Sequence, residues 1–244
     1  MAEVESTDPE SAGQSRQQQL ALAVQLRDDA TLDNFLALAK TQPLLAALQA
    51  QLTPTGEAVI YLYGPAGSGK SHLLQASCHV AAAKTLYLPL ADLRRYPAPD
   101  VLQGVEHLDR VCIDDIDAVL GDPEWERALF NFYNSARQHG CRLVVAGAAA
   151  PRALAVDLED LRSRLAWGVV FQLAQADDED KSAILQFRAA RRGLVLAPGV
   201  ANYVVSRAPR AMQELLQVLD KLDKASLTEQ RGLSIPFVKA ALGW

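Results

Sequence analysis

The sequence predicts an α/β fold, with a parallel five-stranded sheet covered by helices and followed by a small all-helical subdomain. Three observations predict it. Strand-like and helix-like runs alternate from about residue 31 to residue 173, a glycine-rich G-x-x-x-x-G-K-S segment follows the first strand, and the strand signal ends beyond Asp177. Such alternation is typical of parallel strands joined by crossover helices. We therefore expect an α/β domain over residues 31–175 and a helical subdomain over 176–244.

The chain begins with a polar segment. Residues 1 to about 19 are rich in Glu, Ser and Gln and show no hydrophobic periodicity, so we expect a flexible tail within residues 1–30. A helix is expected from Ser71 to Ala83, and another helix has Asp122 as its N-cap and Pro123 at its first position. The expected strands are apolar runs of strand length: 58–63, 85–90, 110–114, 142–146 and 169–173.

Helical signals dominate the last third of the chain. Asp177 or Asp178 caps a helix that ends near Arg192, with Gly193 as its C-terminal stop. Pro198 opens the next helix. A third helix carries an apolar stripe at the i, i+3, i+4, i+7 spacing of an amphipathic helix: Met212, Leu215, Leu216 and Leu219.

The composition argues against several classes of protein. The 244 residues carry a formal net charge of −5, which disfavours a large nucleic-acid footprint because phosphate binding needs clustered Lys and Arg. No apolar run reaches bilayer length and the N-terminus lacks the pattern of a signal peptide, so we expect a cytoplasmic protein without membrane contact. Cys78, Cys112 and Cys141 are odd in number and lack metal-ligand spacing, which indicates reduced and mostly buried thiols.

The glycine-rich segment matches the phosphate-binding P-loop at every fixed position. Its glycines allow the backbone to wrap a di- or triphosphate with the N–H groups pointing inward. Lys70 would then reach the β- and γ-phosphates, and Ser71 would ligate Mg²⁺. A turn with a chance Gly-Lys-Ser is the alternative, but the strand before it and the helix after it favour a nucleotide site. The residues are Gly64, Pro65, Ala66, Gly67, Ser68, Gly69, Lys70 and Ser71.

Two acidic residues end the third expected strand. An apolar run over 111–113 is followed by Asp114 and Asp115, which is the Walker B pattern. Asp114 would hold Mg²⁺ through water, and Asp115 would polarise an attacking water. Acids at a strand end can also simply begin a turn. Their distance after an intact P-loop, with one strand between, favours the nucleotide role and indicates an additional-strand ATPase rather than a nucleoside kinase.

Further segments, in a fixed order along the chain, carry a family resemblance. Residues 31–35 look like a T-F-D-N-F segment, 112–116 like an I-D-D-I Walker B, and 161–168 like an L-x-S-R-[LFM]-x-W-G arginine-finger segment. With 219–226 and 235–239, they make the chain resemble the DnaA family of AAA+ proteins, and more closely its short Hda-type members. The resemblance spans roughly residues 19–242. It implies an AAA+ P-loop NTPase fold with a C-terminal helical lid subdomain.

The resemblance also implies a function in DNA replication. Hda-type proteins bind ADP or ATP with Mg²⁺, dock on the DNA polymerase sliding clamp (beta subunit) and stimulate ATP hydrolysis by the initiator DnaA, which inactivates it. We expect this chain to be such a negative regulator of replication initiation, and the family allows a homo-oligomer. DnaA continues past its lid into a helix-turn-helix domain, whereas this chain ends at Trp244, so we expect no sequence-specific DNA binding.

The tail contains a segment similar to the clamp-binding peptide of Hda-type proteins. Residues 19–24 read Q-L-A-L-A-V, against a family pattern of Q-L-x-L-x-[LV]. The Gln19 amide would make hydrogen bonds at the edge of a pocket on the clamp, and alternate aliphatic side chains would enter an apolar groove. The same alternation fits a half-buried strand, and Ala23 stands where the family commonly has Pro. The apolar anchors would be Leu20, Leu22 and Val24.

Two departures from the family pattern put the chain's own ATP hydrolysis in doubt. Ala148 stands where DnaA relatives have a polar sensor, and a methyl group cannot orient a water. The sensor Arg of the lid falls on Gln213, which lacks the positive charge. Arg210, placed one helical turn earlier, would either reach the phosphates or be a surface charge. We therefore expect a resident diphosphate and weak or absent turnover.

Arg164 is the expected catalytic residue. In Hda-type proteins the corresponding Arg enters the nucleotide site of a neighbouring ATP-loaded DnaA in trans. Arg162 is the other candidate for this role. A third interpretation is that Arg162 and Arg164 are both only surface charges of a helix. The Ser163-Arg164 pair matches the family motif and favours Arg164. A self-sufficient AAA+ ATPase, acting as a helicase loader or remodeller, is the alternative function.

Overall fold

A parallel sheet of five strands forms the centre of the α/β part. The computed structural model describes residues 26–80 and 83–244. The sheet order is β2-β3-β4-β1-β5, and every pairing is parallel. β4 therefore lies between the P-loop strand β1 and the Walker B strand β3, which confirms the additional-strand arrangement. The strands are β1 (Val59–Tyr63), β2 (Thr85–Pro89), β3 (Arg110–Asp114), β4 (Arg142–Gly147) and β5 (Val169–Gln172).

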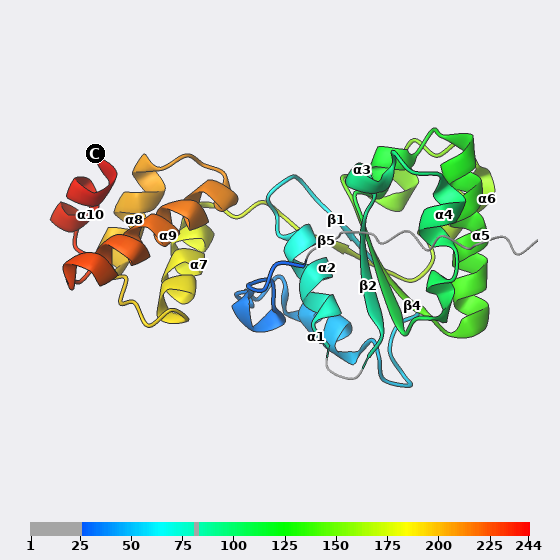
Figure 1. Ribbon diagram of the computed structural model, residues 1–244, viewed down its shortest axis with the longest axis horizontal. Coiled ribbons are helices and arrows are strands. Elements are labelled where there is room, and N and C mark those ends of the chain that lie inside the picture. Colours follow the sequence, from blue (N-terminus) through cyan, green and yellow to red (C-terminus); the bar gives the residue numbers. More distant parts are fainter. Residues whose placement is uncertain (1–25, 81–82) are drawn as a thin grey trace, which may run out of the picture.

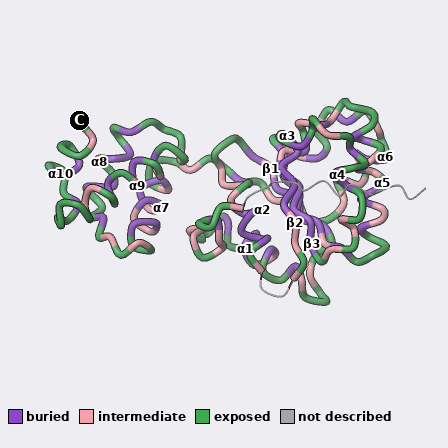
Figure 2. Tube along the Cα trace, viewed as in Figure 1, coloured by how far each residue is buried: buried purple, intermediate pink, exposed green. Residues whose placement is uncertain are grey.

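Helices cover both faces of the sheet (Figure 1). Because successive side chains of a strand point to opposite faces, Ile60 and Leu62 pack with α1 (Gln42–Ala50) and α2 (Lys70–Cys78), whereas Tyr61 packs with the helices of the other face. The central strands are buried on both sides (Figure 2), which explains their continuous apolar sequences. The helices of the second face are α3 (Leu90–Leu93), α4 (Ala98–Leu102), α5 (Pro123–His139) and α6 (Glu159–Leu165).

One charged side chain is buried at the edge of this core. Arg110, the first residue of β3, is 1 % exposed. Its guanidinium donates to the Leu48 carbonyl oxygen (3.0 Å) near the end of α1 and to the Ser77 carbonyl oxygen (2.7 Å) near the end of α2. Carbonyl groups at helix C-termini attract cations, so Arg110 ties two helices to the sheet.

Four helices pack together at the C-terminal end of the chain (Figure 1), and their buried side chains form a hydrophobic cluster separate from the two clusters of the sheet. The predicted apolar stripe lies on α9, where Leu215 and Leu219 are buried and Met212 and Leu216 are partly buried. The helices are α7 (Asp178–Ala190), α8 (Pro198–Arg207), α9 (Met212–Glu229) and α10 (Ile235–Leu242). The predicted architecture, a parallel five-stranded α/β sheet followed by a small helical subdomain, is confirmed.

The predicted helix starts are confirmed in detail. Asp122 caps α5 by accepting from two backbone N–H groups, and Pro123 is the first helical residue. Asp177, rather than Asp178, caps α7, and it forms a reciprocal capping box with Asp180. Pro198 begins α8 as predicted.

Other local predictions differ from the structure. The helix after the P-loop ends at Cys78 rather than Ala83, because the Thr85 hydroxyl donates to the Cys78 carbonyl oxygen (2.8 Å) and His79 leaves the helical conformation. The tail and its segment 19–24 lie outside the described residues. The three cysteines are free and buried, as predicted. No helix in the described part of the chain is long and apolar enough to span a bilayer.

Candidate functional site

The P-loop connects the carboxyl end of β1 to the start of α2. Gly67 and Gly69 have φ values of +76° and +98°, a left-handed conformation that non-glycine residues rarely adopt. A Cβ at Gly67 would meet nothing within 4 Å, whereas one at Gly69 would lie 3.0 Å from the Phe35 ring. No side chain of the described residues caps the start of α2, so its first backbone N–H groups are available to an anion. The loop therefore has the shape and the donors that a phosphate chain requires.

Three side chains of the loop add polar groups to this cradle. Lys70 Nζ donates to the carbonyl oxygens of Gly64 (2.7 Å) and Pro65 (3.0 Å), so the ammonium lies over the loop. The Ser68 hydroxyl is buried and has no hydrogen-bond partner among the described residues. Ser71, in the first turn of α2, is exposed and can act as a metal ligand. These residues fit a di- or triphosphate with Mg²⁺.

The Walker B acids lie in different surroundings. Asp114 is 1 % exposed; its Oδ2 accepts from the Tyr87 hydroxyl (2.7 Å) and its Oδ1 from the Asp115 backbone N–H (3.0 Å). Burial, followed by the carboxylates of Asp114 and Asp117, raises the pKa of Asp115, and the Lys70 ammonium opposes this rise. The Lys70 ammonium is thus close enough to Asp115 for their charges to interact.

These carboxylates do not form a metal site by themselves. Among the described residues there is no group of three or more His, Cys, Asp and Glu side chains that could hold a metal ion. Mg²⁺ in nucleotide sites usually keeps waters and is bound by one or two protein ligands together with phosphate oxygens. Asp114 and Ser71 fit that mode, in which the nucleotide supplies the other ligands.

The segment before α1 packs against the P-loop helix. The rings of Phe35 and His72 lie 5.8 Å apart, and His72 Nε2 is 3.0 Å from the Thr31 carbonyl oxygen. Burial lowers the pKa of His72. The sequence singled out residues 31–35 only through their family resemblance, and nothing in their periodicity indicated this contact with the P-loop.

The two sensor positions offer no charge to the site. Ala148 follows β4, and its backbone N–H donates to Asp117 Oδ1 (2.8 Å). Gln213 lies in the first turn of α9 and is exposed. The predicted position of Arg210, one helical turn earlier, is wrong, because Ala211 is extended and α9 begins only at Met212. Arg210 is an exposed residue of the loop before the helix.

The expected arginine finger lies in the last turn of the short helix α6. Arg164 Nε donates to Asn134 Oδ1 (2.9 Å) on α5, and its guanidinium carbon lies 5.2 Å from the Trp167 ring and 5.7 Å from the Phe130 ring. Arg164 is partly exposed. An amide oxygen and two ring faces hold the side chain in place without neutralising its charge.

Arg162, the other candidate, is engaged within its own segment. Its guanidinium lies 3.3 Å from the Glu159 carboxylate and donates to the Val156 carbonyl oxygen (2.7 Å). By contrast, no carboxylate of the described residues lies within ion-pair distance of Arg164. This difference favours Arg164 as the residue that could act outside its own chain.

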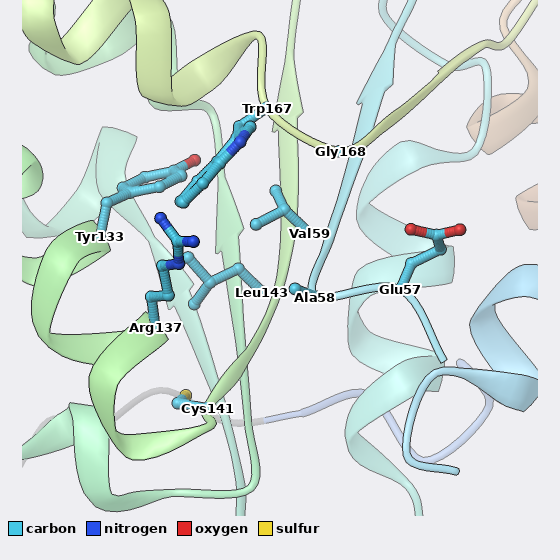
Figure 3. A pocket seen from close by; sticks show the side chains of 9 residues that line it. All are labelled: Glu57, Ala58, Val59, Tyr133, Arg137, Cys141, Leu143, Trp167 and Gly168. Atoms are coloured by element: carbon cyan, nitrogen blue, oxygen red, sulfur yellow. The ribbon is translucent and has the colours of Figure 1, made fainter. Parts of the chain in front are cut away.

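A pocket of about 250 Å³ lies between α5 and the segment that directly follows α6, the helix that carries Arg164 (the finger helix). Figure 3 shows Tyr133 and Arg137 of α5 extending toward Trp167, with Val59 and Leu143 completing the wall. The Arg137 guanidinium carbon is 4.1 Å from the centre of the Trp167 ring. The pocket lies at the amino ends of β1 and β4, whereas the P-loop follows the carboxyl end of β1, so it is not part of the nucleotide site.

Polar contacts join the lid helix α7 to the N-terminal segment. Arg188 is buried and donates to Asp29 Oδ2 (2.7 Å) and to the Asn34 carbonyl oxygen (3.0 Å), and Lys40 pairs with Asp180. Burial raises the pKa of Asp29, but the hydrogen bond from Arg188 and the charges of Arg27 and Arg188 outweigh it, so the net pKa is lowered. The segment that packs on the P-loop helix therefore also holds the lid.

Comparison with known proteins identifies the family. The model of the bacterial DnaA ATPase domain matches residues 26–172, more than half of the chain. The chain belongs to the DnaA family. A second model, the lid domain of Hda, matches residues 178–242 and covers the four C-terminal helices. The resemblance to Hda-type DnaA-family AAA+ proteins that the sequence motifs indicated is therefore confirmed.

Solved structures share the fold at low sequence identity. Domain III of the Thermotoga maritima replication initiation protein DnaA is 22% identical, with a TM-score of 0.72 over 90% of this chain and 98% of that chain. AMPPCP-bound DnaA from Aquifex aeolicus is 21% identical, with a TM-score of 0.70 over 84% of this chain and 67% of that one. A RuvB motor from Thermotoga maritima is 16% identical with a TM-score of 0.61, over 88% of this chain and 71% of that chain.

The structure of this DnaA-family chain places the predicted nucleotide-binding motifs and the predicted finger in different parts of the α/β domain. The P-loop and the Walker B acids come together at the carboxyl edge of the sheet, whereas Arg164 lies on a helix over one face. Sequence reasoning missed Tyr87 and Asn134, the direct hydrogen-bond partners of Asp114 and Arg164. A tyrosine in an apolar strand and an asparagine in an amphipathic helix give no signal of such roles by themselves. The roles of all these residues remain predictions.

Proposed function

We propose that this chain is a nucleotide-bound negative regulator of DNA replication initiation that stimulates ATP hydrolysis by DnaA. In this proposal residues 64–71 bind ADP, or ATP, with Mg²⁺ held by Ser71 and Asp114. Residues 19–24 dock on the sliding clamp, and Arg164 supplies positive charge in trans to the nucleotide of DnaA. The family assignment and the Hda-type lid support this reading.

The contrast between Arg164 and the chain's own sensors carries the proposal. Arg164 is partly exposed, held by the Asn134 amide oxygen and free of any carboxylate partner in the described part of the chain. The sensor positions carry Ala148 and Gln213, which cannot place positive charge on a bound triphosphate. A chain with an available finger and an incomplete site of its own is suited to act on the nucleotide of a neighbour.

Nucleotide binding has support of its own. The left-handed glycines form a cradle for phosphates, together with the start of α2 and the buried Ser68 hydroxyl, neither of which has a side-chain partner within residues 26–80 and 83–244. The similar DnaA structure from Aquifex aeolicus was solved with AMPPCP bound. With neither sensor supplying charge to a γ-phosphate, we propose that ADP is bound at least as tightly as ATP.

The alternative is a self-sufficient AAA+ ATPase that loads or remodels a helicase. The intact P-loop and Walker B residues favour it, namely Lys70, Ser71, Asp114 and Asp115. The fold similarity to the RuvB motor is consistent with this alternative. Ala148 and Gln213 oppose it, because a polar sensor is expected at position 148 and a positively charged Arg at position 213.

Steady-state ATP hydrolysis decides between the two functions. The purified chain is assayed alone. It is then added in substoichiometric amount to ATP-loaded DnaA in the presence of the sliding clamp and DNA. The regulator predicts little turnover alone and strong, clamp-dependent hydrolysis with DnaA. Turnover by the chain alone at the rate of a motor protein, without further stimulation by DnaA, would establish the alternative.

A further inference from the structure

A buried acidic residue beneath the finger helix takes no part in the nucleotide site. Glu126 lies in the first turn of α5 and is 2 % exposed. Burying a carboxylate is costly unless cations or N–H donors compensate it. No Lys, Arg or His of the described residues lies within ion-pair distance of Glu126. Hydrogen bonds must therefore supply the compensation.

Three backbone N–H groups from two loops point at this carboxylate. Oε1 accepts from Gly121 (2.8 Å) and Asp157 (3.1 Å), and Oε2 accepts from Leu158 (2.6 Å). Charge-assisted bonds of this kind are about twice as strong as neutral ones. The side chain thereby joins the loop before α5 to a loop that follows it by more than thirty residues.

Two of the three bonds fall at the start of the finger helix. Leu158 is the N-cap residue of α6, and its own side chain makes no capping hydrogen bond. Glu126 thus holds the backbone where α6 begins. Asn134 lies two turns further along α5 and accepts a hydrogen bond from Arg164, which is in the last turn of α6. α6 has seven residues, and its two buried side chains, Leu161 and Leu165, supply the apolar packing that accompanies these polar contacts. α5 consequently holds α6 at both ends.

We propose that Glu126 is a positioning residue for the arginine finger. Its carboxylate fixes the start of α6, so that Arg164 emerges opposite Asn134 and keeps one orientation toward its target. Without this tie, α6 can slide or rotate on α5, and each residue of slippage moves the finger by about 1.5 Å along the axis and turns it by about 100°. The effect on activity rests on the proposed function; the effect on α6 does not.

Two variants and a matched control test the proposal. Glu126→Ala removes all three bonds, whereas Glu126→Gln keeps one acceptor oxygen and nearly the same shape. Glu124→Gln is the control, since Glu124 occupies the same helical turn and is exposed. Amide hydrogen exchange of the intact protein, measured by mass spectrometry, reports on α6 without any assay of function. Stimulation of ATP hydrolysis by DnaA is measured on the same samples over a range of concentrations.

We expect exchange in residues 157–165 to rise by about tenfold or more in Glu126→Ala and less in Glu126→Gln, and to stay unchanged in the P-loop helix. Stimulation of ATP hydrolysis by DnaA, measured at saturating concentration of the variant, should likewise fall more in Glu126→Ala than in Glu126→Gln. The affinity of both variants for nucleotide should be unchanged. The proposal is overturned if amide exchange in α6 is unchanged, or if exchange rises equally throughout the sheet. It is also overturned if α6 exchanges faster but the variant still stimulates ATP hydrolysis by DnaA fully. If Arg164→Ala also stimulates fully, the proposed function fails, and the exchange data still decide whether Glu126 holds α6.

Discussion

Replacing Arg164 by Ala distinguishes a role in chemistry from a role in folding. In the folded chain the guanidinium makes one hydrogen bond to Asn134 and lies over the rings of Phe130 and Trp167. In this partly exposed setting, the hydrogen bond and the two cation–π contacts together stabilise the fold by about 1–2 kcal/mol. For a chain of this size, that loss lowers the melting temperature by about 2–8 °C.

The expected loss of function is much larger. Arginine fingers supplied in trans raise phosphoryl-transfer rates by about 10³–10⁵, which corresponds to about 4–7 kcal/mol in the barrier. Arg164→Ala should therefore abolish nearly all stimulation of DnaA while nucleotide and clamp binding persist. Arg164→Lys should restore little, because it keeps the charge but loses the planar guanidinium.

Arg162→Ala is the matched control for this experiment. It removes the ion pair with Glu159 and the hydrogen bond to Val156, so its cost to stability is comparable. The assay measures hydrolysis by ATP-loaded DnaA in the presence of clamp-loaded DNA. The reasoning is refuted if Arg164→Ala stimulates as well as the wild type, or if both variants lose activity in proportion to their melting temperatures.

Three further outcomes are expected. Calorimetry should show that Lys70→Ala weakens the binding of ADP and of ATP to a similar degree. The wild type should bind ADP at least as tightly as ATP, and a strong preference for ATP would contradict the proposed effect of Ala148 and Gln213. Replacing Leu22 and Val24 by Ala should abolish co-elution with the sliding clamp without changing the melting temperature, whereas a drop of several degrees would mark the segment as core. Because the pKa of Asp29 is lowered in the folded chain, its ion pair with Arg188 stabilises the fold above pH 3.8, and this stabilisation is lost as the pH falls below that value. The difference in melting temperature between the wild type and Asp29→Asn should therefore disappear in acid.

The sheet could be predicted from the sequence because each strand is an apolar run, and the central strands β1, β3 and β4 are buried on both faces. The predicted ends of β3, at Arg110 and Asp114, match the structure. Helix α5 could be predicted for a different reason, since Asp122 and Pro123 mark its start by local chemistry that needs no tertiary contact.

The finger helix and the partners of the site residues could not be predicted in this way. α6 has seven residues, of which only Leu161 and Leu165 are buried, and this is too short for a periodic signal. The bond between Tyr87 and Asp114 depends on the parallel register of β2 and β3, which sets Tyr87 beside Cys112. Such contacts arise from the pairing of distant segments, and no local pattern encodes them.

The strand order has a consequence for synthesis of the chain. β1, which leads into the P-loop, is among the first elements made, but its neighbours in the sheet are β4 and β5. The last of these ends at Gln172, about 110 residues after β1. At translation rates of about 5–20 residues per second, β1 waits roughly 5–20 s for its partners. Both edges of this apolar strand are unpaired until β4 has been made, and the edge toward β5 stays open for pairing with other chains until the end of the interval.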